Sequence, residues 1–254
     1  MKENRFLYAV WLVSFPFLFS CQGGPRNAGR DLKNAEFPLY TIEKNIVSPE
    51  RRGHISVSLA LLALPEQADL SPLLKGLLYE GMDSRQYADR RIASLEELSA
   101  DLDRTSGELG REEVQWEYTE TFTLITDVSD PDILAISRDR DYYLGGAHGT
   151  SEKQYFTISR SRGAELGPGD FVPPEKDGVF LALIEDALRE YSGIGPGAPL
   201  GAGGFFEDAL EEIPDNFYPG RNGMVFRWDP YEIAPYSTGP IEVTVSWEKI
   251  RSLP

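Results

Sequence analysis

The chain has few of the residues that most enzymes use for nucleophilic or metal chemistry. Its 254 residues include one cysteine, Cys21, and two histidines, His54 and His148. A single cysteine cannot form an intramolecular disulfide, and structural zinc sites need clustered cysteines and histidines. A Ser-His-Asp site needs a histidine beside its serine, and the sequence has neither a G-x-S-x-G nor an H-E-x-x-H motif. We expect no catalytic residues, no metal and no cofactor, although the two histidines could still meet in space.

Basic residues are also scarce. The chain has 25 Lys and Arg against 41 Asp and Glu, which gives a formal net charge of −16. This balance argues against nucleic acid as a partner, because phosphates are bound by Lys and Arg. It also argues against simple adhesion to an anionic lipid surface. An acidic protein attracts cationic partners, although the charge could equally serve solubility alone.

The longest apolar run lies near the N-terminus and is too short for a transmembrane helix. Residues 6–19 are apolar apart from Ser14 and Pro16, and they follow the basic residues Lys2 and Arg5. A basic start, a short apolar region and a small residue before the cleavage point are typical of a secretory signal peptide. We therefore predict that residues 1–20 are a signal peptide.

Cys21 follows this run directly. The segment Leu18-Phe19-Ser20-Cys21 resembles a bacterial lipobox, in which cleavage leaves the cysteine to carry lipid. The alternative is an ordinary signal peptide that leaves a free thiol. Residues 21–35, rich in glycine and polar residues, predict a flexible tether. The expected location is extracytoplasmic, with Cys21 anchoring the protein to the lipid bilayer of a bacterial membrane.

The remaining sequence predicts an α+β protein with antiparallel or mixed sheets and a few packed helices. Residues 54–59 alternate as in a half-buried strand, and His54 opens that strand as an exposed residue. Apolar residues at steps of three and four predict two helices after Ser71, which we expect to be the N-cap of the first. The other predicted elements are a strand at 39–42, a helix-capping Asp83 or Ser84, strands from 113 onward and at 155–159, a helix at 179–191, a hairpin at 217–228 and a strand at 241–247.

Two segments look like possible active sites but have simpler interpretations. Residues 192–204 are rich in glycine, but no Lys-Ser or Lys-Thr follows, so a loop is predicted instead of a phosphate-binding loop. Four carboxylates at 207, 208, 211 and 212 could include a glycosidase-like pair. We interpret this segment as a solvated helix that Phe205 and Phe206 anchor to the core.

The segment Tyr142–Gly149 combines aromatic residues, three glycines and a histidine between two strand-like runs. Gly145, Gly146 and Gly149 permit positive φ and close backbone approach, which is typical of a tight turn. His148 could contact a ligand at the rim of this turn. We favour a structural role, in which its imidazole hydrogen-bonds to a backbone carbonyl and holds the turn.

Four motifs in order resemble one known family. They are the G-G-A-H-G turn at 145–149, the N-F-Y strand at 216–218, the glycine-led strand at 223–226 and the Y-E-I-A-P-Y segment at 231–236. Together they resemble the extracytoplasmic domain of unknown function found in the lysozyme-sensing anti-sigma factor RsiV and beside the catalytic domain of the peptidoglycan deacetylase PdaC. Residues 142–254 resemble this RsiV-like domain, and residues 36–141 the PdaC-type domain that precedes it. The resemblance implies two closely joined α+β subdomains.

The resemblance leaves two classes of function open. One is a non-catalytic binding module for a lysozyme-like muramidase, which is cationic, or for peptidoglycan. The other is a peptidoglycan-modifying enzyme or its accessory domain, although the T-F-D-D motif and spaced histidine pair of such deacetylases are absent. The oligomeric state stays open.

The segment Tyr231–Tyr236 is the candidate binding loop. Prolines stiffen it, and rigid aromatic side chains on a loop give a large contact area at low entropic cost. Pro235 and Tyr236 are expected to be exposed, and Tyr231 belongs to the same candidate loop. The alternative, that Tyr231 and Ile233 pack beneath the sheet, stays open.

Overall fold

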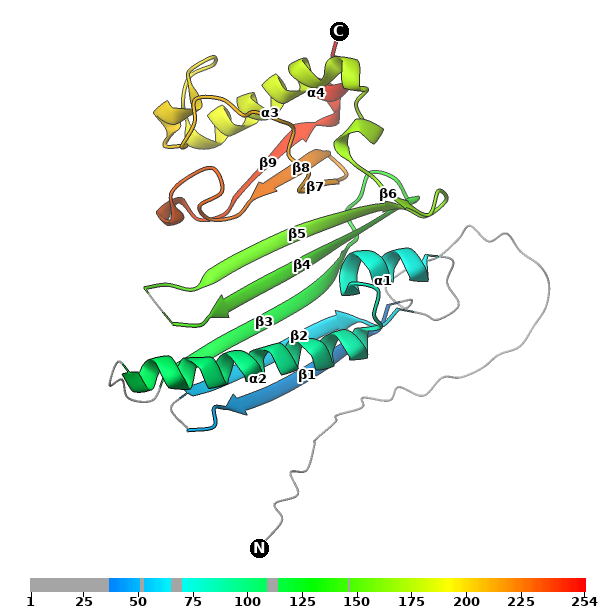
Figure 1. Ribbon diagram of the computed structural model, residues 1–254. Coiled ribbons are helices and arrows are strands. Elements are labelled where there is room, and N and C mark those ends of the chain that lie inside the picture. The colour runs from blue at the N-terminus through cyan, green and yellow to red at the C-terminus, as the bar shows by residue number, and fades with distance from the viewer. Residues whose placement is uncertain (1–36, 51–52, 65–69, 109–113, 146) are drawn as a thin grey trace, which may run out of the picture. The chain divides into compact units, whose positions relative to one another are not determined.

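The computed structural model describes residues 37–50, 53–64, 70–108, 114–145 and 147–254. Two sheets and their helices make up this part of the chain (Figure 1). In chain order the elements are β1 Leu39–Val47, β2 Gly53–Leu62, α1 Ser71–Tyr79, α2 Ser84–Glu108, β3 Val114–Ile125, β4 Ile133–Tyr143, β5 Thr150–Ser159, β6 Ala164–Glu165, α3 Asp177–Ser192, β7 Phe217–Pro219, β8 Gly223–Trp228, β9 Ile241–Ser246 and α4 Trp247–Arg251. The predicted α+β class is confirmed.

The larger sheet is mixed, and its strands follow chain order from β1 to β6. β2 and β3 run parallel, whereas the other neighbouring pairs are antiparallel. A parallel pair needs a long crossover connection, and α1 and α2 provide it here. Figure 1 shows α2 lying across one face of the sheet near β1 and β2.

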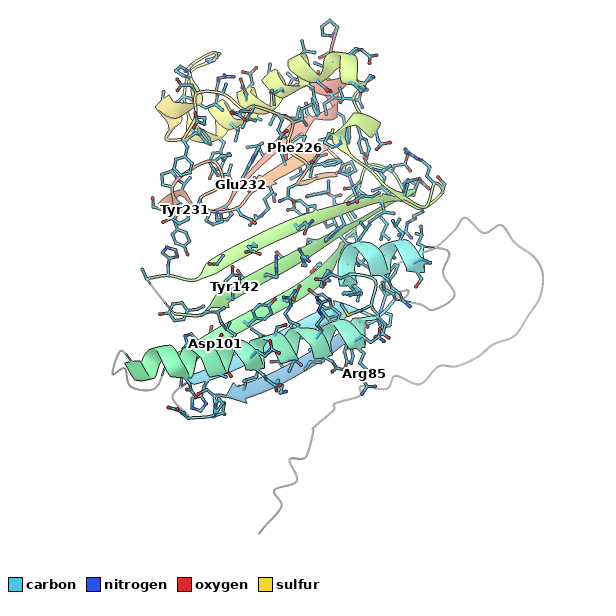
Figure 2. The ribbon with its side chains drawn as sticks, viewed as in Figure 1. Arg85, Asp101, Tyr142, Phe226, Tyr231 and Glu232 are labelled. Atoms are coloured by element: carbon cyan, nitrogen blue, oxygen red, sulfur yellow. The ribbon has the colours of Figure 1, made fainter. Side chains whose placement is uncertain are left out.

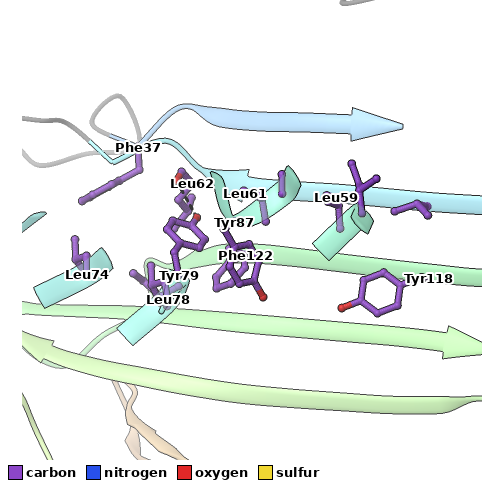
Figure 3. Packing of buried hydrophobic residues seen from close by; sticks show 14 of the residues in the cluster. Phe37, Leu59, Leu61, Leu62, Leu74, Leu78, Tyr79, Tyr87, Tyr118 and Phe122 are labelled. Carbon is purple, nitrogen blue, oxygen red and sulfur yellow. Dashed lines mark hydrogen bonds between the residues drawn. The ribbon is translucent and has the colours of Figure 1, made fainter. Parts of the chain in front are cut away.

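The first core lies between this sheet face and the two helices. The predicted alternation in β2 is confirmed, because Ile55, Val57, Leu59 and Leu61 are all buried. The helix side contributes Leu74, Leu78, Tyr79, Tyr87, Ala88, Ile92 and Leu95, and Figure 3 shows part of this packing. Tyr79 and Phe122 meet edge to face at 5.2 Å, a favoured aromatic geometry.

The two helix starts differ in their capping. Asp83 accepts a hydrogen bond from the Gln86 amide at 2.8 Å while Gln86 Oε1 accepts one from the Asp83 amide, so the predicted cap of α2 is confirmed. The predicted cap of α1 is wrong. Leu70 takes the N-cap position, and Ser71 is already helical and buried. Pro72 remains in the first turn, where a missing amide hydrogen has no cost.

A fully buried carboxylate, Glu120, lies in this core. It accepts hydrogen bonds from the hydroxyls of Tyr87 at 2.7 Å and Tyr118 at 3.0 Å, and Arg91 Nε lies 3.3 Å from it. A buried charge is tolerated when it is paired and hydrogen-bonded in this way. Burial, and then the charge of Glu120, raise the pKa of both tyrosine hydroxyls. Both therefore stay protonated as donors to Glu120 near neutral pH.

The second core lies between α3 and the antiparallel sheet β7-β8-β9. The predicted hairpin of β7 and β8 is confirmed. Gly223 opens β8 against the backbone of β9, where an added Cβ would lie 2.2 Å from the Val245 carbonyl oxygen. Only glycine fits so close a backbone approach, which explains the glycine at the start of this strand.

Several sequence-based details of this second half are wrong. Val179 and Tyr191, the first and last residues of the helix predicted at 179–191, are exposed and do not contribute to its buried face. Trp247, expected in the last strand, begins α4. Residues 205–212 do not form the predicted helix, and their backbone bends without regular secondary structure. Phe205 is buried there, whereas Phe206 is exposed and does not anchor the segment.

Side chains of the second sheet bind the free edge of β5. The side-chain amide of Asn216 donates to the Lys153 carbonyl at 2.8 Å and accepts from the Tyr155 amide at 2.9 Å, as a neighbouring strand would. Both carboxylate oxygens of Asp229 lie 3.1 Å from the Lys153 amide nitrogen. The Tyr155 hydroxyl donates to Glu242 at 2.7 Å. Polar side chains thus satisfy a strand edge that would otherwise be open.

The predicted division between residues 141 and 142 falls inside β4, which pairs with β3 and β5 on either side of it. The sheet is continuous through this point. Within the described residues, no helix combines the length and the apolar character needed to cross a membrane. The predicted signal peptide, Cys21 and the tether lie outside the described residues.

The Asn216 contacts lead to a stability prediction. We expect Asn216→Ala to lower the free energy of unfolding by about 1–3 kcal/mol, because it leaves the Lys153 carbonyl and the Tyr155 amide without partners. Urea denaturation measures the loss, and hydrogen exchange at the Tyr155 amide should accelerate. The control is Asn222→Ala, since Asn222 is exposed and its side chain makes no hydrogen bond among the described residues. Equal stabilities of the two variants would contradict this role.

Candidate functional site

Two segments about eighty residues apart in the sequence meet at one end of β5. One is the turn between β4 and β5, and the other is the connection between β8 and β9. The Tyr236 hydroxyl donates to the Gly149 carbonyl at 2.9 Å. The rings of His148 and Tyr236 stack with centroids 3.8 Å apart and an angle of 19° between their planes. The structure therefore brings together the two motifs that the sequence singles out.

The turn between β4 and β5 favours glycine at two described positions. Gly145 has a φ of +93°, a conformation that side chains other than glycine rarely adopt. At Gly149, an added Cβ would lie 3.1 Å from the Tyr142 carbonyl oxygen. Gly146 lies outside the described residues. The tight turn predicted from these glycines thus has a steric basis at Gly145 and Gly149.

His148 lies exposed at this turn. Its Nδ1 is 3.0 Å from the carbonyl oxygen of Gly149, so the contact with a backbone carbonyl that the sequence suggested is present. The same oxygen accepts the Tyr236 hydroxyl, so one carbonyl joins the two segments. One face of the imidazole stacks on the ring of Tyr236. His148 thus contacts the backbone of the turn and the ring of Tyr236, and it forms part of the surface.

Tyr231 has an unusual backbone conformation for an aromatic residue. Its φ is +74°, and 58% of its surface is exposed. Its ring centroid lies 5.4 Å from that of Tyr236 and 6.1 Å from that of His148. Figure 2 shows Tyr231 on the β8–β9 connection, on the side facing the β4–β5 turn. We call His148, Tyr231 and Tyr236 the aromatic triad.

A short carboxylate-capped turn sets the position of Tyr231. Glu232 Oε2 accepts from the Asp229 amide at 2.8 Å, and the Glu232 amide donates to the Asp229 carbonyl at 3.1 Å. The Asp229 side chain is at the same time bound to the β5 edge. Burial raises the pKa of the Asp229 carboxyl group, although the Lys153 amide and Arg227 oppose this. The turn that carries Tyr231 is thereby attached to the larger sheet.

The rest of the candidate loop divides between core and surface. Ala234 is buried and Ile233 packs against the second core, whereas Pro235 is exposed and Tyr236 is half-buried. The interpretation that places Tyr231 beneath the sheet together with Ile233 is wrong for Tyr231. The exposure expected for Pro235 is confirmed. Tyr236 presents part of its ring while its hydroxyl stays bound to the turn.

The site presents aromatic ring faces and hydrogen-bonding groups. Within the described ranges, no group of three or more His, Cys, Asp or Glu side chains is arranged to hold a metal ion. Planar rings with polar tips give both apolar contact area and hydrogen-bonding capacity.

Two residues at the site were not found from the sequence. Asn216 was assigned only to a strand motif, although its side chain makes the contact with β5. Phe206 was assigned to the core, but its amide donates to the Ile233 carbonyl at 2.9 Å and its side chain is exposed. Nothing in the sequence distinguishes the exposed Phe206 from the buried Phe205 beside it.

The backbone conformation of Tyr231 can be tested through stability. A left-handed conformation costs a residue other than glycine about 1–2 kcal/mol, and asparagine tolerates it better. We expect Tyr231→Asn to leave the free energy of unfolding unchanged or to raise it by up to about 1 kcal/mol, measured by urea denaturation. Tyr191→Asn is the matched control, because it makes the same change at an exposed tyrosine of α3, where the backbone is helical and asparagine relieves no strain. A clear loss of stability in Tyr231→Asn would show that the conformation is unstrained.

Comparisons with known proteins give a family match for one segment of the chain and similar folds for most of it. Residues 170–248 match the family DUF3298, described as a protein of unknown function. A search of curated proteins finds no match to this chain. A crystal structure of a DUF3298 family member from Bacteroides fragilis is similar with a TM-score of 0.70 and 16% identity, covering 86% of this chain and 92% of that one.

A second solved structure agrees with the first. A DUF3298 family protein from Pseudomonas aeruginosa PAO1 is similar with a TM-score of 0.54 and 14% identity, covering 85% of this chain and 94% of that one. At such identities the likeness concerns the fold alone. Residues 170–248 thus form a DUF3298 family domain, and the fold of DUF3298 proteins extends over most of the chain.

Proposed function

We propose that this protein is a lipid-anchored, extracytoplasmic binding module without catalytic activity, and that its partner is a lysozyme-like muramidase. The observation that carries the proposal is the aromatic triad. Two remote segments assemble it, and Tyr231 is held exposed in a strained conformation. Packing alone gives no reason to keep a tyrosine at this position, because the ring is mostly in solvent. Strain of this kind concentrates at functional sites.

The charge of the segment that carries Tyr231 and Tyr236 supports a cationic partner. Residues 228–248, which include the candidate loop, contain four acidic residues and no Lys, Arg or His. The whole chain carries a net charge of −16. A muramidase that is cationic would be attracted to this surface, and complementary charge mainly accelerates association.

The resemblance of four motifs to the RsiV-like family supports the choice of partner. Two of these motifs, the G-G-A-H-G turn and the Y-E-I-A-P-Y segment, supply all three rings of the triad. In the family that the chain resembles, the sensor RsiV responds to lysozyme. The shared residues therefore lie at the site that we propose for binding.

Binding kinetics test the role of Tyr236. We expect immobilised protein to bind a cationic lysozyme, with association that slows as salt rises because the attraction is screened. Tyr236→Ala should accelerate dissociation about tenfold or more, because a residue that is buried at the interface of a complex mainly sets the lifetime of that complex. The salt dependence of association should stay nearly unchanged. Surface plasmon resonance at several salt concentrations measures both rates.

The control for this experiment is Tyr191→Ala, which removes an exposed tyrosine from α3 outside the triad. It should bind like the wild type. Wild-type protein that binds no lysozyme at low salt excludes this partner, and a Tyr236→Ala protein that dissociates at the wild-type rate excludes the triad. Release of acetate from acetylated peptidoglycan, with or without divalent metal, would contradict the non-catalytic role.

The membrane anchor is tested separately. Cys21→Ala removes the only thiol that could carry lipid. We expect it to abolish metabolic labelling with palmitate and to release the protein from membranes, because one acylated residue is the proposed attachment. Membrane association that persists in Cys21→Ala, together with an unlabelled wild type, would contradict the lipoprotein assignment.

A further inference from the structure

Phe206 is a large apolar side chain that the fold leaves exposed next to the candidate loop. Phe205, its neighbour, is buried in the second core, whereas 52% of Phe206 is accessible to solvent. The Phe206 amide donates to the Ile233 carbonyl at 2.9 Å. Ile233 lies two residues after Tyr231 and three before Tyr236. The hydrogen bond therefore places the start of residues 205–212 beside the segment that carries two rings of the triad.

The conformation of residues 205–212 is held by α3. Glu185 Oε1 accepts from the Leu210 amide at 3.0 Å, and Arg189 binds Glu185 Oε2 at 2.9 Å. The Leu200 amide donates to the Asp208 carbonyl at 2.9 Å. Phe206 thus projects from a segment with fixed contacts, which lowers the entropy lost when it binds a partner.

The charges around Phe206 are all of one sign in this part of the sequence. Residues 190–220 contain six acidic residues and no Lys, Arg or His. Glu207, Glu211 and Glu212 are exposed, and no hydrogen bond or ion pair engages their carboxylates among the described residues. An exposed aromatic side chain in an acidic segment of the chain is complementary to a partner surface that combines an apolar patch with Lys and Arg.

We propose that Phe206 and its neighbouring carboxylates form a second part of the docking surface, and that this part selects a cationic protein as the partner. The inference rests on the proposed function, since Phe206 extends the surface of the aromatic triad. Its ring contacts an apolar patch of the partner, and Glu207, Glu211 and Glu212 face basic side chains around that patch. Peptidoglycan fragments, which carry carboxylates, would be repelled by this charge.

The test separates the aromatic contribution from the charge contribution, with a cationic lysozyme as the probe. Phe206→Ser should accelerate dissociation about fivefold or more and leave the salt dependence of association unchanged. Its matched control is Val179→Ser, which removes another exposed apolar side chain, at the start of α3. Phe206→Ala serves as a milder variant, and melting temperatures establish that each protein is folded.

The charge contribution is measured with the triple variant Glu207→Gln, Glu211→Gln and Glu212→Gln. We expect it to slow association at low salt several-fold and to flatten the dependence on salt. The control removes three exposed carboxylates elsewhere, with Glu97→Gln, Glu117→Gln and Glu175→Gln. It has the same net charge, so a difference between the two triple variants measures the position of the charges.

The outcomes distinguish a failure of this inference alone from a failure of the proposed function. If wild type binds lysozyme, Tyr236→Ala dissociates faster and Phe206→Ser behaves like Val179→Ser, the second part of the surface is wrong and the proposed function stands. If the two triple variants associate at the same rate, the charge selection is wrong. Wild-type binding to soluble peptidoglycan fragments in place of lysozyme overturns the cationic partner and the proposed muramidase together.

Discussion

The position of the candidate site depends on how polar side chains occupy the free edge of β5. Asn216 reproduces the hydrogen bonds of a neighbouring strand at Lys153 and Tyr155, and Asp229 takes the remaining Lys153 amide. These contacts join the two sheets without a continuous ladder. Asp229 also begins the turn that carries Tyr231. The same side chains that protect a strand edge therefore bring the candidate loop to the turn between β4 and β5.

The aromatic triad is more constrained than a chance cluster of surface rings. The Gly149 carbonyl binds the Tyr236 hydroxyl and lies within hydrogen-bond distance of His148, and the two rings stack above it. Tyr231 keeps its exposed position at the cost of a left-handed backbone, which Glu232 stabilises from within the turn. A preformed arrangement of this kind loses little conformational entropy when it binds.

The sequence predicts which residues are buried where burial follows local periodicity. It does not predict burial or contacts that depend on segments remote in the sequence. The alternation in β2 and the apolar stripe of α2 were predicted, because one face of each element is buried regularly. The burial of Glu120 was not predicted. It depends on hydrogen bonds from the hydroxyls of Tyr87 and Tyr118, which the alternation along the strand does not reveal. Both motifs of the site were singled out, but their contact depends on the edge of β5. Phe206 shows the same limit, because no periodicity says which of two adjacent phenylalanines is buried.

In the proposed function, a surface built from two segments couples binding to the contact between the sheets. A partner that touches both His148 and Tyr231 binds only while the β4–β5 turn and the β8–β9 connection are in place. Binding therefore stabilises that arrangement by mass action, and any weakening of the Asn216 contacts lowers the fraction of protein that can bind. The proposed binding and the folding stability are thus linked through β5, although none of its edge contacts belongs to the aromatic triad.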